Sequence, residues 1–194
     1  MQRLCVFCGS SAGTRTVYAE ATRALGKALA ARGVGLVYGG GHVGLMGILA
    51  DSVLEAGGAV IGVIPQALVD KELAQAGLTE LHVVTTMHQR KALMADLADG
   101  FMALPGAFGT ADELFEILTW AQLGLHAKPI GLLNVAGYFD PLRAWLDHTV
   151  REGFLRSAHR QLLLEAVAPE RLLEVLGRYR PVADTPKWID ERDR

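Results

Sequence analysis

The sequence predicts an α/β protein with a doubly wound parallel sheet flanked by helices. Short, almost continuously apolar segments alternate along the chain with longer amphipathic segments, and turns rich in glycine or small hydroxyl residues follow several of the apolar segments. Strands that are covered on both faces are apolar throughout, and a regular alternation of strands and helices is typical of parallel sheets. Each predicted element is justified by this pattern.

The predicted strands are the apolar runs at residues 4–8, 35–38, 59–64, 81–84, 100–104, 129–133 and 162–167. The predicted helices are the amphipathic stretches at residues 16–32, 45–55, 87–97, 110–123, 141–152 and 169–178. The helix at 110–123 has the clearest pattern, because Leu114, Ile117, Leu118 and Ala121 recur on one helical face. We predict a single nucleotide-binding catalytic domain over residues 1–181 and a polar tail over 182–194.

Composition excludes several classes of protein. Hydrophobic residues make up 51% of the 194 residues and charged residues 21%, which is typical of a globular chain and not of a disordered or fibrous one. The net charge is −2, so the chain lacks the basic field that holds nucleic acid, and we expect no nucleic-acid partner. Pro65 and Gln66 interrupt the longest apolar stretch, so we expect no membrane span.

The cysteines and the first residues predict a cytoplasmic protein. The chain has two cysteines, Cys5 and Cys8, which are too few for a disulfide framework. The apolar run that follows Arg3 is too short for the core of a signal peptide.

The turns after the strands are the first candidates for a binding site, because ligands of open parallel sheets bind beyond the carboxyl ends of the strands. Four such segments are residues 9–13, 39–44, 85–91 and 105–110. Each opens a helix, whose free N–H groups and dipole favour an anion. Glycine is also common in ordinary tight turns, but the convergence of glycine-bearing turns on one sheet edge favours an anion site.

The familiar nucleotide motifs are absent. No G-x-G-x-x-G follows the first strand, and the second strand ends in Gly39, Gly40 and Gly41 instead of an acidic residue, which disfavours a nicotinamide cofactor. No Lys-Ser or Lys-Thr pair follows the glycines, which disfavours ATP hydrolysis. No cluster has metal-ligand spacing, and we expect no metal. Cys5 and Cys8 form a C-x-x-C, but residues three apart on one strand point to opposite faces.

Two helix starts carry charged residues that need an explanation. Arg90 and Lys91 lie in the first turn of a predicted helix, the end where the dipole disfavours a cation. An anion between them and the helix end would explain their position, and a solvated basic pair is the alternative. Glu113 and Glu116 share a face of the helix that follows the turn at 105–109, although acids near a helix start can also simply cap it.

Residues 39–47 (GGGHVGLMG), 87–91 (MHQRK) and 105–113 (PGAFGTADE) resemble the LONELY GUY (LOG) family of cytokinin-activating phosphoribohydrolases, whose members are often labelled lysine decarboxylases. The likeness extends to about residue 181. It implies a Rossmann-like fold and hydrolysis of the N-glycosidic bond of a cytokinin riboside 5′-monophosphate, and AMP is a second expected substrate. It also implies a homodimer or a larger assembly that needs no metal or redox cofactor.

The resemblance also implies roles for individual residues. Arg90 and Glu113 correspond to the catalytic pair. The implied substrate-binding residues are Ser10, Gly39, Gly40, Gly41, Met46, Glu72, Arg90, Lys91, Gly106, Ala107, Phe108, Gly109, Thr110, Glu113 and Thr119. Ala107 stands where the family has a second glycine, so we expect an ordinary negative φ there.

The chemistry of the residues fits this activity. Breaking the C1′–N bond generates an oxocarbenium-like ribose, which an ionised Glu113 would stabilise while it orients water, and Arg90 would keep it ionised. Lysine decarboxylation would need a Schiff-base lysine with an acidic partner for the cofactor ring, and we identify no such set. The alternative is a non-catalytic nucleotide-binding or carrier module on the same fold; Glu113 within its full motif favours the enzyme.

Overall fold

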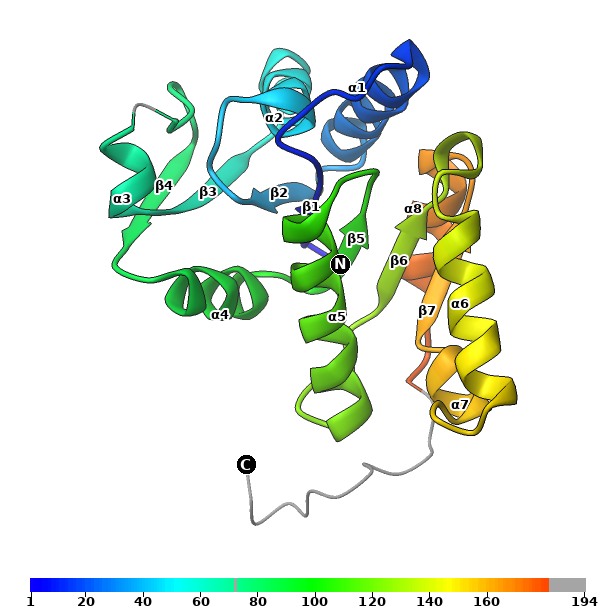
Figure 1. Cartoon of the computed structure of the whole chain (residues 1–194). Helices are drawn as coiled ribbons and strands as arrows, with labels where there is room; N and C mark the ends of the chain where they lie inside the picture. Colours follow the sequence, from blue (N-terminus) through cyan, green and yellow to red (C-terminus); the bar gives the residue numbers. More distant parts are fainter. Residues whose placement is uncertain (72, 182–194) are drawn as a thin grey trace.

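A parallel sheet of seven strands in the order β4-β3-β2-β1-β5-β6-β7 forms the centre of the molecule (Figure 1). The computed structural model describes residues 1–71 and 73–181. The strands are β1 (Arg3–Phe7), β2 (Gly35–Tyr38), β3 (Val60–Pro65), β4 (Glu80–Val84), β5 (Gly100–Ala103), β6 (Ile130–Leu133) and β7 (Leu163–Ala166). This arrangement confirms the predicted Rossmann-like parallel sheet.

The helices include all those that the sequence predicts, with ends that differ by no more than two residues. They are α1 (Thr16–Ala31), α2 (Gly44–Glu55), α3 (Gln66–Val69), α4 (Met87–Leu97), α5 (Phe108–Leu123), α6 (Asp140–Arg151), α7 (Ser157–Arg160) and α8 (Pro169–Arg178), with a 3₁₀ turn η1 (Val135–Gly137). The sequence analysis missed α3, α7 and η1, which are too short to show a helical period. None of the helices among the described residues is long and apolar enough to cross a bilayer.

Two separate hydrophobic cores explain why the central strands are apolar throughout. Along β1 and the residue after it, Leu4, Val6 and Cys8 enter one core, whereas Cys5 and Phe7 enter the other. Helices α1, α2 and α8 contribute to the first core, and α4, α5 and α6 contribute to the second. The sheet is therefore covered on both faces, and the two cysteines point to opposite faces, as their spacing predicts.

Strand β4 departs from the prediction that every strand is buried on both faces. It lies at one edge of the sheet, and its Leu81 and Val83 are 41% and 47% exposed. An apolar run alone does not distinguish an edge strand from a central one, because its residue types are the same.

The strand order creates a crevice beside β1. The chain moves outward from β1 to β4, returns through α4 to β5, and then moves outward again to β7. The direction of winding therefore reverses between β1 and β5, and ligands of such sheets bind at the carboxyl ends of the strands at this point. The turns after β1, β2 and β5 meet there.

Candidate active site

A cavity of about 360 Å³ opens where the turns after β1, β2 and β5 meet. Backbone hydrogen bonds tie the three turns together: the Gly9 N–H donates to the Pro105 carbonyl oxygen at 3.0 Å, and the Leu45 N–H donates to the Gly9 carbonyl oxygen at 3.0 Å. The cavity is thus built from segments far apart in the sequence. The cavity lies at the sheet edge where the sequence predicts an anion site.

Glycine is required where these turns approach each other. Gly44 has φ of +59°, and a Cβ atom there would lie 2.3 Å from the carbonyl carbon of Ser10. A Cβ atom on Gly106 would lie 2.0 Å from the hydroxyl oxygen of Thr110. A side chain at either position would force the turns apart, which explains these glycines without any appeal to flexibility.

Arg90 reaches the cavity from α4, which packs on the face of the sheet opposite to that covered by α1 and α2. A capping box between Thr86 and Gln89 fixes the start of α4 and places Arg90 in its first turns. The side chain is buried; its Nε donates to the carbonyl oxygen of Val63 at 3.1 Å and its Nη2 to that of Gly39 at 3.2 Å. These acceptors offset the unfavourable position of a cation at a helix N-terminus, and exclude the alternative of a solvated basic pair for Arg90.

The third partner of Arg90 is the carboxylate of Glu113. The Nη1 atom of Arg90 lies 3.2 Å from Oε1 of Glu113, and both side chains are about nine-tenths buried. Burial raises the pKa of the Glu113 carboxyl to about 7, although the charge of Arg90 acts to lower it. The expectation that Arg90 keeps Glu113 ionised is thus met only in part, because removal from water outweighs the ion pair. The group titrates in the neutral range, where a catalytic acid or base is useful.

Lys91 forms a second set of ion pairs beside the first. Its Nζ lies 3.0 Å from Oδ2 of Asp112 and 3.1 Å from Oε2 of Glu116. Burial acts to lower the pKa of Lys91, but the hydrogen bonds of the two acids outweigh it and raise the pKa. Neighbouring cations on α4 therefore pair with successive acids on α5. Arg90 and Glu113 line the cavity, whereas Lys91 does not.

Neutral donors lie at the start of α5. The N–H groups of the first three residues of α5 have no partner within the helix, because the carbonyl groups four residues before them lie outside it. The hydroxyl oxygen of Thr110 is buried, has no hydrogen-bond partner among the described residues, and belongs to a side chain that lines the cavity. Ala107, at the N-cap, has φ of −111°, so alanine fits there without strain, as expected. The arrangement suits an anion with several oxygens.

The cavity brings together nine of the predicted substrate-binding residues, which are Ser10, Gly39, Met46, Arg90, Gly106, Ala107, Gly109, Thr110 and Glu113. Gly40 and Gly41 belong to the same turn without lining the cavity, and Phe108 is 94% exposed beside it. The Thr119 hydroxyl donates to the Phe115 carbonyl oxygen and lines a separate small hollow. Glu72 lies outside the described residues.

The aromatic residues of the cavity, Tyr18 and Tyr138, were missed by the sequence analysis. Tyr138 follows β6, and the rule that singled out the turns after the other strands applies to this turn as well. In sequence this turn has neither the glycine cluster nor the charged residues that mark the other turns as candidate sites. Sequence therefore gave a usable signal for Tyr138 and none for Tyr18.

The described residues form no cluster suited to a metal ion, and their two cysteines are not reactive thiols. Among residues 1–71 and 73–181, no group of three or more histidine, cysteine, aspartate and glutamate side chains could hold a metal ion. Cys5 and Cys8 are buried and not bonded to each other, and burial raises the pKa of both thiols. A thiol with a raised pKa is a poor nucleophile, so the C-x-x-C is a structural feature.

Comparison with known proteins shows the family to which the chain belongs. A family described as "Possible lysine decarboxylase" matches residues 46–176. A probable cytokinin riboside 5′-monophosphate phosphoribohydrolase, LOGL1 of Oryza sativa subsp. japonica, is 49% identical over 96% of this chain and 85% of its own length. The cytokinin riboside 5′-monophosphate phosphoribohydrolase LOG2 of Arabidopsis thaliana is 47% identical over 94% of this chain and 86% of its own length. The chain belongs to the LOG family.

Solved structures show how widely the LOG fold is shared. A molybdenum cofactor binding protein from Rippkaea orientalis has a TM-score of 0.69 at 22% identity, over 90% of this chain and 94% of its own. A molybdenum cofactor carrier protein from Chlamydomonas reinhardtii also has a TM-score of 0.69, at 21% identity, over 91% and 96%. At such low identity the likeness concerns the fold alone.

Proposed function

We propose that this LOG-family chain is an N-glycosyl hydrolase that converts cytokinin riboside 5′-monophosphates to the free base and ribose 5-phosphate. The observation that carries the proposal is the buried Glu113 carboxyl, 3.2 Å from Arg90, in a cavity that also presents anion-binding donors. The activity named for the plant relatives supports the same conclusion.

The 5′-phosphate is expected at the N-terminal end of α5. Free N–H groups, the helix dipole and the Thr110 hydroxyl favour an anion there, and Ser10 lies on the facing turn. Thr110 and Glu113 are three residues apart and share a helical face. A phosphate at the helix end would therefore place the ribose along that face, with C1′ toward Glu113.

Glu113 would act on the bond between C1′ and the base. As that bond breaks, its electron pair stays on the base, and the ribose acquires positive charge that a carboxylate stabilises. The same carboxylate would accept one proton of the attacking water, whose oxygen bonds to C1′, and would pass it to the departing base, so that the neutral base and ribose 5-phosphate are released. Each of the three guanidinium nitrogens of Arg90 lies near an acceptor of the protein, one of which is Glu113, so we assign Arg90 first to holding and ionising Glu113.

The proposal extends to features inferred from the resemblance. We propose AMP as a second substrate, a catalytic domain over residues 1–181, a cytoplasmic homodimer as the working form, and no need for metal or nucleic acid. Several residues that do not line the cavity remain proposed substrate contacts: Gly40, Gly41, Lys91, Phe108 and Thr119. Glu72 also remains a proposed substrate contact.

Incubation with AMP and with N6-isopentenyl-AMP, in the presence and absence of a metal chelator, tests the proposed function. We expect equal amounts of base and ribose 5-phosphate from at least the N6-isopentenyl substrate, at the same rate with chelator. Binding of both nucleotides without any base release would instead indicate a carrier module. Loss of activity with chelator and its recovery with a divalent cation would contradict the metal-free mechanism.

A further inference from the structure

Tyr138 holds the active-site turn that precedes α5. Its hydroxyl donates a hydrogen bond of 2.6 Å to the carbonyl oxygen of Gly106, and its side chain lines the cavity. Its ring packs edge-on against Tyr18, with centroids 5.6 Å apart, and against Phe139, with centroids 4.9 Å apart. The ring is 39% exposed but contacts another aromatic ring on two sides, and the hydroxyl provides one specific link to the turn.

The backbone that carries Tyr138 is an unusual turn fixed by the Asn134 side chain. Ala136 has φ of +50°, the only positive φ among the non-glycine residues that the structure describes. The Asn134 amide oxygen accepts from the Phe139 N–H at 2.8 Å, and its nitrogen donates to Oδ1 of Asp140 at 2.8 Å. Asn134 thus closes the turn from the end of β6 to the start of α6, and sets the direction in which Tyr138 points.

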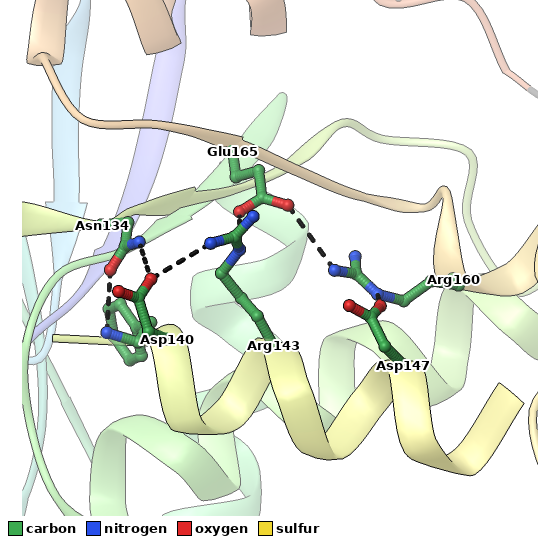
Figure 2. Close-up of polar contacts among 7 residues, drawn as sticks. Asn134, Asp140, Arg143, Asp147, Arg160 and Glu165 are labelled. Carbon is green, nitrogen blue, oxygen red and sulfur yellow. Dashed lines mark hydrogen bonds and ion pairs between the residues drawn. The ribbon is translucent and has the colours of Figure 1, made fainter. Parts of the chain in front are cut away.

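A chain of ion pairs supports this turn from behind (Figure 2). Arg143 lies between Asp140, at 3.1 Å, and Glu165 on β7. Glu165 also faces Arg160, at 3.5 Å, and Arg160 pairs with Asp147 at 2.8 Å. The start of α6 is thereby tied to β7 and α7, outside the cavity.

The bond to Gly106 fixes a peptide plane beside the anion-binding donors. A trans peptide is planar, with its C=O and N–H groups pointing in opposite directions. Holding the Gly106 carbonyl oxygen therefore also sets the direction of the Ala107 N–H, next to the free N–H groups of α5. Gly106 has no side chain to restrict this peptide, and a Cβ atom there would collide with Thr110. The Tyr138 hydroxyl supplies a side-chain hydrogen bond that restricts this peptide.

We propose that Tyr138 is a positioning residue for the phosphate: its hydroxyl orients the Gly106–Ala107 peptide so that the turn before α5 binds the phosphate of the substrate and of ribose 5-phosphate. The inference rests on the proposed function. Tyr138 acts through Gly106 and does not touch the reacting bond. It governs affinity for phosphate-bearing ligands and leaves the rate of bond cleavage unchanged.

Tyr138→Phe tests the inference, because it keeps the ring and its packing and removes only the hydroxyl. We expect KM for N6-isopentenyl-AMP and the inhibition constant of ribose 5-phosphate to rise together by about 2- to 12-fold, the equivalent of one hydrogen bond. The inhibition constant of adenine, which carries no phosphate, and kcat should stay within about twofold, because neither depends on that bond. Tyr38→Phe is the matched control: the Tyr38 hydroxyl is buried without a partner among the described residues, and all four constants should hold.

Several results would overturn the inference. Unchanged constants for ribose 5-phosphate in Tyr138→Phe would show that the hydroxyl does not serve the phosphate. Equal weakening of adenine and ribose 5-phosphate would indicate a general loss of cavity structure, and a fall in kcat at constant KM would indicate a role in bond cleavage. If the wild-type protein proved inactive, the proposed function would fail, but calorimetric binding of ribose 5-phosphate to both proteins would still test Tyr138.

Discussion

At the scale of single residues, the protonation of Glu113 controls the proposed reaction. Burial raises its pKa to about 7, whereas an ordinary glutamate titrates near 4.5. A carboxylate that stabilises positive charge on the ribose has to be ionised, so the active fraction of the free enzyme increases as the pH rises through 7. The neighbouring guanidinium of Arg90 opposes the shift and keeps the group within a useful range.

The pH dependence of kcat/KM follows from this pKa. Below about pH 7 the value should fall tenfold for each pH unit, and above it should level off, because kcat/KM reports ionisation in the free enzyme. Assays of the wild-type protein at pH values below and above 7 give the profile. The residual kcat/KM of Glu113→Gln should not show the decrease below pH 7. A profile that falls as the pH rises through 7 would show that Glu113 acts as an acid and not as a carboxylate.

Arg90 and Lys91 carry the same charge and should behave differently. Arg90→Ala removes the stronger of the two cations that lower the pKa of Glu113; because about half of Glu113 is ionised at pH 7, a rise of about 1–3 pKa units would reduce kcat/KM at that pH by about 5- to 500-fold. Lys91→Ala should be the milder change, because Lys91 does not line the cavity and is the weaker of the two cations that lower this pKa; we expect a loss below about threefold.

Assays at higher pH separate the electrostatic role of Arg90 from others. Part of the activity of Arg90→Ala should return as the pH rises, since Glu113 then ionises without its partner. An equal loss in both variants at every pH would contradict the assignment of Arg90 to Glu113.

At the scale of elements, the turn after β2 and the start of α4 fit each other across the sheet. A Cβ atom on Gly39 would lie 1.7 Å from Nη2 of Arg90. Gly39→Ala should therefore displace the guanidinium and reduce kcat/KM by about as much as Arg90→Ala does. Gly177→Ala, on α8, is the control: no atom lies within 4 Å of its Cβ position, so activity should be unchanged and stability should rise by about 0.5–1 kcal/mol.

Kinetics and thermal unfolding of these two variants provide the measurement. Wild-type kcat/KM in Gly39→Ala would show that the position tolerates a side chain and that Arg90 is not held as described.

The elements that sequence predicted are those long enough to carry a pattern. The helix at 110–123 was recognised from Leu114, Ile117 and their neighbours, and it differs from α5 only at its start. There the first turn includes Phe108 and Gly109, which resemble a glycine-rich loop in sequence. Strand β4 looked central because an edge position depends on strand order, which a single chain segment does not encode.

At the scale of the whole molecule, the predicted site depended on topology more than on any local pattern. Sequence and family resemblance indicated that Arg90 and Glu113 act together, and the two lie 3.2 Å apart. They did not indicate that Lys91 pairs with Glu116 or that Tyr138 reaches Gly106. Those contacts depend on how α4, α5 and the turn after β6 pack around the sheet, and residue types alone do not determine such packing.

Exposed aromatic side chains support the proposed homodimer. Phe154 is 83% exposed and Trp145 52% exposed, and both line a groove beside α6. Light scattering at micromolar concentration should give at least twice the chain mass of 20.8 kDa. Phe154→Asp should shift the protein toward monomer, because it places a charge in an apolar contact, whereas Val167→Asp, 74% exposed after β7, should leave the mass unchanged. A wild-type monomer would contradict the proposal.

The turnover number of Glu113→Gln tests the central claim most directly. Glutamine keeps the size of the side chain and removes the negative charge that faces the developing oxocarbenium ion. We expect kcat for N6-isopentenyl-AMP to fall by about 100-fold or more while the binding of AMP changes little, because the charge matters mainly in the transition state. A kcat within about threefold of the wild-type value would show that the catalytic carboxylate lies elsewhere.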